Sequence, residues 1–349
     1  MQRRNFIKNI SAASAISFVP FKNFGFTKDE NNLQTLKPNR FKKGDTIGLI
    51  APASFITEDE LKESIKNLES LEFKVAYTKN ILAKYGYLAG TDEQRASDVN
   101  EMFERKDIDG IVCARGGYGC ARILPLLNYE LIKNNPKILI GYSDVTALLY
   151  GIYKKTGLVC FHGPVGISTF NNFSTEYFND VLIYPHSDLT LFNSDEDKED
   201  DEFKVATIRS GSAKGKLVGG NLSIVVSLIG TPYDIESEGK IIFLEEIGEE
   251  PYRIDRMLTQ MIQAGKFNNA AGIALGVFKN SKSKEEKSGI ASSFTLNEVL
   301  FDRLSSLKIP VLYGLSFGHI TNKFTLPFGI EAELNSISQT LKLLEPAVI

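Results

Sequence analysis

Residues 138–150 read Ile-Leu-Ile-Gly-Tyr-Ser-Asp-Val-Thr-Ala-Leu-Leu-Tyr. The apolar residues 138–140 predict a buried strand, the glycine marks a tight turn, and the run from Val145 to Tyr153 has the composition of a helix. A chain that passes from a strand through a sharp turn into a helix holds the residue at the turn clear of the sheet edge. That residue is Ser143, and its hydroxyl is therefore a candidate nucleophile.

The turn around Ser143 also has a simpler interpretation. Serine is a preferred residue at helix N-termini, where its side chain caps a free backbone amide. The motif also departs from G-x-S-x-G, because Val145 stands where the second glycine would be. The motif alone leaves a capping serine and a nucleophile both open. If Ser143 is a nucleophile, the amide of Asp144, at the helix N-terminus, is placed to stabilise an oxyanion.

Strands and helices alternate on the N-terminal side of this turn. The expected elements are a strand at 46–51, a helix that starts with a capping box at Thr57 and Glu60, a strand at 73–77, a helix at 92–105, a strand at 108–114 and a helix at 121–133. This alternation predicts an α/β domain with a parallel sheet over residues 36–168. The carboxyl ends of its strands then share one edge.

A glycine-rich loop, Arg115-Gly116-Gly117-Tyr118-Gly119, follows the predicted strand 108–114. It should lie at the same sheet edge as Ser143, where the amide of Gly117 can complete an oxyanion hole. Arg115 has the charge and position to bind a substrate carboxylate. A phosphate-binding loop is the alternative, although the spacing is not G-x-G-x-x-G and the loop follows an internal strand.

The pattern weakens over residues 169–212, where we expect an interdomain linker. Residues 195–202 are almost wholly acidic, which is typical of a solvated loop. Beyond the linker, residues 213–349 predict a second, smaller α/β domain. Its expected elements are strands at 216–218, 240–244, 272–278 and 311–313, and helices at 222–228, after Pro251 and at 296–307.

Two carboxylates, Glu245 and Glu246, directly follow the predicted strand 240–244. A carboxylate at a strand end can orient an imidazole. His319 lies in a glycine-flanked loop after the strand 311–313, a suitable place for a general base. A lone histidine in a loop is also often just a hydrogen-bonded surface residue. Glu245 is the better candidate of the two carboxylates because it is nearest the sheet.

The chain contains only two other histidines, His162 and His186. His162, in Phe161-His162-Gly163-Pro164, suits a position that supports the catalytic residues without touching the substrate. His186 lies in the expected linker. Neither has an acidic partner nearby in the sequence.

Composition narrows the classes of function. The 349 residues, 43% hydrophobic and 24% charged, are enough for two domains with cores. The net charge of −3 and the absence of tryptophan disfavour nucleic-acid binding. Three cysteines without CxxC spacing predict neither a disulfide framework nor a zinc site, and we expect them to be buried. No metal or cofactor is indicated.

The N-terminus has the order of an export signal. Arg3-Arg4 precedes an apolar run, residues 9–21, that is too short to span a bilayer but fits the hydrophobic region of a signal peptide. Arg3-Arg4 resembles a twin-arginine signal, so we expect residues 1–35 to be a signal peptide with a polar tail and the protein to be periplasmic or otherwise exported. A frayed basic tail is the alternative.

Together, these segments resemble the LD-carboxypeptidase family over residues 36–344. The resemblance rests on the order and spacing of several motifs across both halves of the chain. They are Gly44-Asp45-Thr46-Ile47-Gly48, Ala51-Pro52-Ala53-Ser54, Ala89-Gly90-Thr91-Asp92 with Arg95, Arg115-Gly116-Gly117-Tyr118-Gly119, Gly141-Tyr142-Ser143-Asp144, His162-Gly163-Pro164, Gly219-Gly220-Asn221-Leu222, Pro251-Tyr252-Arg253-Ile254-Asp255-Arg256 and Phe317-Gly318-His319.

The resemblance implies a flavodoxin-like N-terminal domain, a C-terminal domain of the swivelling β/β/α kind and a site between them. It implies Ser143 as nucleophile, His319 as base, Glu245 as the carboxylate that orients the base, and the amides of Gly117 and Asp144 as oxyanion hole. The implied reaction needs no metal and removes the terminal D-alanine of a murein tetrapeptide. A homodimer is a further expectation.

Two other functions stay open. One is a microcin-C-type peptidase that cuts an acyl-sulfamoyl adenylate, although the absence of tryptophan disfavours a large aromatic platform for adenine. The other, of a different class, is a non-catalytic periplasmic binding protein, which also has two α/β domains and a cleft. That function gives Ser143, Glu245 and His319 no common purpose.

Overall fold

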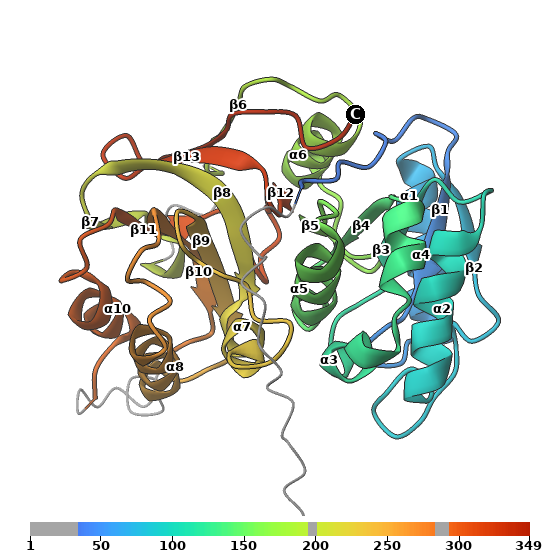
Figure 1. The fold of residues 1–349 in the computed structure, drawn as a ribbon, viewed down its shortest axis with the longest axis horizontal. Coiled ribbons are helices and arrows are strands. Elements are labelled where there is room, and N and C mark those ends of the chain that lie inside the picture. Colours follow the sequence, from blue (N-terminus) through green and yellow to red (C-terminus); the bar gives the residue numbers. More distant parts are fainter. Residues whose placement is uncertain (1–33, 195–200, 283–292) are drawn as a thin grey trace, which may run out of the picture. The chain divides into compact units, whose positions relative to one another are not determined.

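Two sheets with helices packed on them make up the described part of the chain, residues 34–194, 201–282 and 293–349 of a computed structural model (Figure 1). The expected signal segment and most of the acidic run lie outside the described residues. Within these residues, no helix is long and apolar enough to cross a membrane. The prediction of two α/β domains is confirmed.

The first sheet has the strand order of flavodoxin-like folds. Its strands are β1 (Thr46–Ile50), β2 (Lys74–Tyr77), β3 (Gly110–Cys113), β4 (Ile138–Gly141), β5 (Phe161–His162) and β12 (Leu326–Pro327), in the order β12-β5-β4-β3-β1-β2. Strands β1 to β5 are parallel, and β3 and β4 are completely buried, as their apolar sequences predict. In such sheets ligands bind beyond the carboxyl ends of the strands, near the point where the order reverses.

The helices of this domain follow from local sequence signals. Both α1 (Glu58–Ser70) and α2 (Asp92–Glu104) begin with a complete capping box, the first at Thr57 as predicted and the second at Thr91. Helix α5 (Val145–Thr156) ends at Gly157, which takes the left-handed conformation that favours glycine. Helices α2, α4 and α5 pack side by side, and right-handed crossovers place α1 on the other face of the sheet.

The prediction of a single helix at 121–133 is wrong. The structure has α3 (Cys120–Ile123), a short 3₁₀ helix at Leu124–Leu126 and α4 (Tyr129–Asn134). Pro125 lacks the amide that a continuous helix needs, and Asn128 accepts a hydrogen bond from the Leu131 amide to start α4. Both signals are present in the sequence, but our prediction followed the apolar periodicity of residues 121–133 instead.

The second sheet is mixed and contains eight strands in the order β6-β14-β13-β8-β9-β10-β11-β7. Its strands are β6 (Leu189–Leu191), β7 (Ala206–Arg209), β8 (Ser212–Asn221), β9 (Ile241–Ile247), β10 (Gly272–Lys279), β11 (Val311–Leu315), β13 (Glu331–Asn335) and β14 (Thr340–Leu343). Its helices are α7 (Leu222–Leu228), α8 (Pro251–Gln263) and α10 (Leu296–Leu304). The central strands β8 to β11 are parallel, so their carboxyl ends also meet at one edge.

Six strands of this fold, β5, β6, β7, β12, β13 and β14, had no counterpart in our sequence interpretation. Strands β13 and β14 form an antiparallel hairpin whose side chains alternate between half-buried and buried, as the alternating sequence Glu-Ala-Glu-Leu-Asn indicates in retrospect. Strand β12 pairs with β5 of the first sheet, although it lies far along the chain. Its two residues are too few for any periodicity to reveal.

The segment in which we expected a linker is built into both domains. Helix α6 (Asn172–Leu182) packs Phe178 against Phe41 and Phe73 of the first domain, with ring centroids 6.3 Å apart in both pairs. Strands β6 and β7 lie at the two ends of the second sheet. Regular structure therefore occupies much of residues 169–212.

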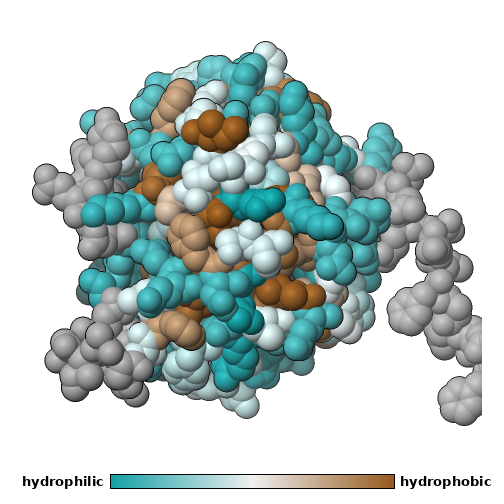
Figure 2. Space-filling model, turned by 90° about the vertical axis from the view of Figure 1, so that its left-hand side faces the viewer, coloured by the Kyte–Doolittle hydropathy of each residue, from teal (hydrophilic) through white to brown (hydrophobic). Residues whose placement is uncertain are grey.

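The surface over the second sheet is mainly polar. Figure 2 views the molecule from the side on which α10 lies, and hydrophobic residues form separate patches among hydrophilic ones. Scattered apolar residues of this kind are normal on soluble proteins. This face therefore does not stand out as a binding site.

Candidate active site

Ser143 occupies a strained turn between β4 and α5. Its backbone has φ +65°, in the left-handed region that costs a residue with a side chain about 1–2 kcal/mol. The amide of Thr146 donates to the Ser143 carbonyl at 2.9 Å, so the helix begins directly after the turn. The helix has Asp144 as its N-cap residue and no side-chain cap, which removes the interpretation of Ser143 as a capping serine. Strain of this kind clusters at functional sites.

The glycine-rich loop lies directly against Ser143. A Cβ added to Gly116 would be 2.8 Å from the Ser143 Cβ and 3.0 Å from its Oγ, and one added to Gly117 would be 2.2 Å from the Ser54 Oγ. Both positions therefore require glycine. Within the described residues, the amides of Gly117 and Asp144 donate no hydrogen bond, so both are available to a ligand.

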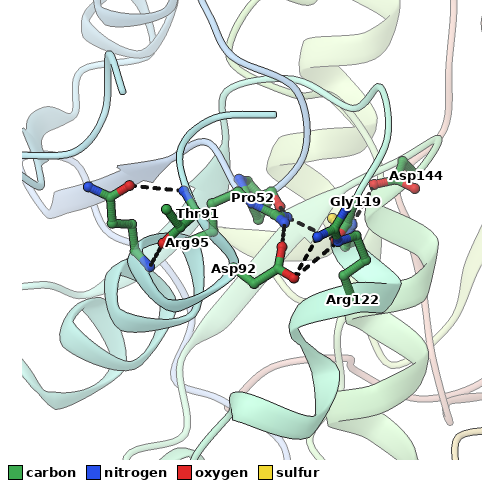
Figure 3. Close-up of polar contacts among 9 residues, drawn as sticks. Pro52, Thr91, Asp92, Arg95, Gly119, Arg122 and Asp144 are labelled. Atoms are coloured by element: carbon green, nitrogen blue, oxygen red, sulfur yellow. Dashed lines mark hydrogen bonds and ion pairs between the residues drawn. The ribbon is translucent and has the colours of Figure 1, made fainter. Parts of the chain in front are cut away.

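Arg95 holds the glycine-rich loop in place. It is 1% exposed, and its Nη1 donates to the carbonyl of Pro52 at 2.6 Å and to that of Gly119 at 2.9 Å. Asp92 accepts from Arg95 and from Arg122, and Figure 3 shows these side chains converging between the two loops. Arg95 therefore joins the loop after β1 to the loop after β3.

Asp144 also takes part in this arrangement. Its side chain is buried, and its Oδ2 accepts a hydrogen bond from the amide of Cys120 at 2.8 Å (Figure 3). The residue that follows the nucleophile candidate is thus tied to the end of the glycine-rich loop. All three cysteines are buried, as expected, and burial raises the pKa of the Cys120 thiol.

Glu245 and Glu246 end up with different partners. The Oε2 of Glu245 accepts a hydrogen bond from His319 Nδ1 at 2.7 Å. Glu246 instead accepts hydrogen bonds from the side chain of Asn221 and from the amide and hydroxyl of Ser223, at the start of α7. The carboxylate that reaches the histidine is therefore Glu245, and Glu246 stabilises a helix N-terminus.

His319 reaches Glu245 because the loop after β11 crosses the end of β10. The carbonyl of Phe317 accepts from the amide of Val277 at 3.1 Å, which anchors the crossing. Gly318, at φ +118°, leaves no room for a side chain, because a Cβ there would be 3.0 Å from the Glu245 Oε2. Glycine at position 318 therefore lets the loop bring His319 against the buried carboxylate.

A second histidine lies on the other side of the Glu245 carboxylate. His162 Nε2 is 3.7 Å from Glu245 Oε1, and both residues are almost completely buried, at 2% and 0% exposure of their side chains. Among the described residues, neither ring nitrogen of His162 nor the Glu245 Oε1 has a hydrogen-bond partner. The sequence indicated a supporting position for His162 but not that it shares a carboxylate with His319.

Electrostatics keep the Glu245 carboxylate ionised. Burial alone would raise its pKa, but His319 and His162 outweigh that effect and hold the pKa of the carboxyl well below its ordinary range. Burial raises the pKa of Glu246, which lacks a histidine. An ionised Glu245 accepts the Nδ1–H of His319 and leaves Nε2 as the basic nitrogen of the ring.

Tyr142 brings the two halves of the site together. Its ring centroid lies 4.9 Å from that of His319, which places the histidine beside the turn that carries Ser143. No hydrogen bond joins Ser143 Oγ to His319 within the described residues. Such contacts often tighten only when substrate is bound.

Two further charged residues near the site are Arg115 and Lys323. Arg115 pairs with Glu60 of α1 at 2.8 Å, so its charge already has a partner. Lys323 has its Nζ 4.7 Å from the centre of the Tyr142 ring and is 5% exposed. We did not predict it, because a lysine four residues after His319 has no local signal. His186 instead pairs with Asp180 at the surface.

Sequence comparison assigns both halves of the chain to one family. Residues 47–163 match the LD-carboxypeptidase N-terminal domain, and residues 214–334 match the LD-carboxypeptidase C-terminal domain. A protein of Bacillus subtilis (strain 168) described as a probable murein peptide carboxypeptidase is 40% identical over 308 residues, which are 87% of this chain and 93% of that protein.

Solved structures agree in fold over almost the whole chain. The structure of MccF in complex with glutamyl sulfamoyl guanosine matches with a TM-score of 0.82 and 27% identity, over 90% of this chain and 100% of that one. A muramoyltetrapeptide carboxypeptidase from Oxalobacter formigenes matches with a TM-score of 0.73 and 29% identity, over 85% and 97% of the two chains. Since both of its domains match, this protein belongs to the LD-carboxypeptidase family of serine peptidases.

Proposed function

We propose that the protein is a serine carboxypeptidase that hydrolyses an L,D-peptide bond and releases the terminal D-alanine of murein tetrapeptides. The observation that carries the proposal is the 2.7 Å hydrogen bond between His319 and the buried Glu245, beside the strained Ser143. Serine hydrolases use a serine as nucleophile, an imidazole as base and a carboxylate that orients the base. The names of the relatives supply the substrate class.

In the first step Ser143 Oγ attacks the carbonyl carbon of the bond between the L-centre of diaminopimelate and D-alanine. His319 Nε2 accepts the hydroxyl proton, while Glu245 holds the ring through Nδ1 and stabilises its positive charge. The amides of Gly117 and Asp144 donate to the oxyanion. The tetrahedral intermediate then breaks its C–N bond, and His319 returns the proton to the leaving amine of D-alanine.

In the second step water replaces the leaving group. His319 Nε2 takes a proton from the water molecule as it attacks the acyl carbon bound to Ser143. The same two amides hold the second oxyanion. Collapse of this intermediate returns the proton to Ser143 Oγ and frees the tripeptide. His319 Nε2 therefore carries the transferred proton in both steps.

The direct test is incubation of the purified protein with murein tetrapeptide and, separately, pentapeptide, with the products identified by mass spectrometry. We expect the tetrapeptide to lose one alanine and the pentapeptide to stay intact, because its terminal bond joins two D-centres. Loss of alanine from the pentapeptide alone, or from neither substrate, would contradict the proposal.

A second candidate substrate is an acyl-sulfamoyl nucleoside, which the likeness to the MccF complex favours. The same serine, histidine and amide pair would attack its acyl carbon. Incubation with a glutamyl sulfamoyl nucleoside separates the two candidates. Turnover of this compound together with an unchanged tetrapeptide would favour the second.

A non-catalytic binding protein is the alternative of a different class. Such a protein needs a cleft but neither a left-handed serine nor a carboxylate–imidazole contact. Binding of a muropeptide without any product, measured by calorimetry and mass spectrometry on one sample, would favour it.

We further propose that residues 1–35 direct export through a twin-arginine pathway. The support is the order of Arg3-Arg4 and the apolar run at residues 9–21. The double variant Arg3→Lys with Arg4→Lys should stay in the cytoplasm, as measured by fractionation and immunoblotting. Export at the wild-type level in this variant would contradict the proposal.

We also propose a homodimer in solution, on the strength of the family resemblance alone. Light scattering coupled to size exclusion measures the mass directly. We expect twice the mass of the 38.7 kDa chain, less any segment removed on export. A single monomeric species at micromolar concentration would contradict it.

A further inference from the structure

The leaving group of a carboxypeptidase carries a free carboxylate. In the proposed reaction this carboxylate is separated from the attacked carbonyl by only a few bonds, so the group that binds it must lie beside the nucleophile. A positively charged side chain is the usual partner of a carboxylate in a partly buried site. This inference rests on the proposed function and names a residue that the sequence did not indicate.

Arg115 is a poor candidate for this task. Its Nη1 already donates to Glu60 Oε1 at 2.8 Å, and both side chains are partly exposed. A substrate carboxylate would have to compete with Glu60 for the same guanidinium. The glycine-rich loop therefore supplies amides to the site, while its arginine is held by α1.

Lys323 has the right position. Its Nζ is 4.7 Å from the centre of the ring of Tyr142, the residue that precedes Ser143. The same ring packs against His319, with ring centroids 4.9 Å apart. The ammonium therefore lies on the ring that also packs against the proposed base, and that ring belongs to the residue next to Ser143 in the chain.

The backbone holds Lys323 in this place. Its amide donates to the hydroxyl of Ser174 at 3.0 Å, and that hydroxyl donates to the carbonyl of Thr321 at 2.9 Å. The next residue, Phe324, donates from its amide to the carbonyl of Ser316 at 2.7 Å. These bonds fix the backbone from which the Lys323 side chain extends toward Tyr142.

The Lys323 ammonium is buried without a dedicated counter-ion. Within the described part of the chain, no carboxylate forms an ion pair with it, and the charged groups that influence it are Glu245, which favours its charge, and Lys279, which opposes it. Burial lowers the pKa of Lys323 to about 8, so the group is still mainly protonated at neutral pH. A buried cation that lacks a partner costs stability.

We propose that Lys323 binds the terminal carboxylate of the substrate and thereby selects peptides with a free C-terminal D-amino acid. The observations that carry this are its burial, its contact with Tyr142 beside Ser143, and the absence of a carboxylate partner among the described residues. Stacking on Tyr142 holds the ammonium while leaving its donors free for a ligand.

The experiment compares two substrates, a murein tetrapeptide with a free terminal carboxylate and the same tetrapeptide with a terminal amide. The wild-type protein should prefer the free acid by about 10- to 100-fold in kcat/KM, the range expected for one charged hydrogen bond. Lys323→Met and Lys323→Gln should lose most of this preference, mainly through a higher KM for the acid. Lys323→Arg should keep part of it.

Thermal unfolding at pH 7 supplies a readout that a merely structural lysine would not give. Lys323→Met should melt at a higher temperature than the wild-type protein, because it removes a buried charge. A structural role predicts a lower melting temperature and an unchanged preference for the acid. Lys214→Met, which changes an exposed lysine on β8, is the matched control and should alter neither quantity.

The outcomes are distinct. If the wild-type protein releases no D-alanine from the tetrapeptide, the proposed function fails. If it does, and both Lys323 variants keep the wild-type preference for the acid, only this inference fails. The inference is also overturned if Arg115→Met abolishes the preference while the Lys323 variants retain it.

Discussion

Glu245 is the residue on which the site depends, because two imidazoles share its carboxylate. His319 takes one oxygen at 2.7 Å, and His162 approaches the other within 3.7 Å. An ionised carboxylate in a completely buried position needs such partners, and removal of one partner of a buried charge is strongly destabilising. We therefore regard His162 as a positioning residue that acts on His319 through Glu245.

The first prediction concerns His162→Gln. The pKa of Glu245 is depressed in the folded protein, so its contribution to stability is present above the ordinary glutamate pKa and is lost as the pH falls through the lower, folded value. Without His162 that folded pKa rises. The acid limb of the kcat/KM profile and the onset of acid unfolding should both move to higher pH.

A control separates this effect from a general loss of a histidine. His186→Gln changes an exposed histidine paired with Asp180 at 3.2 Å and should leave the pH profile unchanged. An acid limb in His162→Gln that coincides with the wild-type limb would contradict the positioning role.

At the scale of elements, the nucleophile depends on how closely a loop approaches a turn. The glycine-rich loop after β3 and the turn after β4 meet with no room for a Cβ at Gly116. Arg95, from α2, holds that loop through the carbonyl of Gly119. The position of Ser143 is thus set by neighbouring elements and not by its own turn alone.

The second prediction concerns Gly116→Ala. The added methyl would meet the Ser143 side chain at 2.8 Å, so the serine must rotate or the loop must move. We expect kcat for D-alanine release to fall at least about 10-fold, since small misplacement of reacting groups is costly. Gly230→Ala serves as control: its φ of +81° strains any added side chain, but the added atom meets nothing within 4 Å, so the variant should keep its kcat even if it loses stability. Equal kcat values in both variants would contradict the account.

Local signals in the sequence predicted most of these elements. The strand, turn and helix around Ser143, the capping box at Thr57 and the glycine-rich loop all depend on residues close together in the chain. The break at Pro125 and the hairpin of β13 and β14 also had local signals, which the periodicity of longer segments obscured. Element ends were off by a few residues, as with β9, which continues through Glu245 to Ile247.

Contacts between distant segments could not be predicted in this way. The pairing of β12 with β5, the approach of His162 to Glu245 and the position of Lys323 over Tyr142 each join residues far apart in sequence. They depend on tertiary packing, which leaves no period or spacing in either segment. The family resemblance supplied the triad but neither His162's contact nor Lys323.

At the scale of the whole molecule, the two sheets bring together residues that neither holds alone. Ser143 and His162 come from the first sheet, and Glu245 and His319 from the second. The amide of Asn221, at the end of β8, donates to Thr146 Oγ1 on α5 at 3.1 Å and joins the two sheets beside the site. Gly220 allows this approach, because a Cβ there would be 2.5 Å from Thr146 Cγ2.

The third prediction concerns Thr146→Val, which keeps the shape of the side chain but removes the acceptor. The buried amide of Asn221 then loses its partner, which should cost about 1–3 kcal/mol in the free energy of unfolding. Chemical denaturation measures this loss, and kcat should fall with it because the two halves of the site are less well aligned. Thr190→Val on β6 is the control. A Thr146→Val protein as stable as the control would contradict the account.

The central claim is that Ser143, His319 and Glu245 act as one catalytic unit across the two sheets. The rate of D-alanine release from a murein tetrapeptide by Ser143→Ala, His319→Ala and the double variant tests it most directly. We predict that each single variant loses at least about 10⁴-fold in kcat and that the double variant is no slower than the singles, because the residues of a triad are not additive. Retained turnover in either single variant, or losses that multiply in the double variant, would contradict the claim.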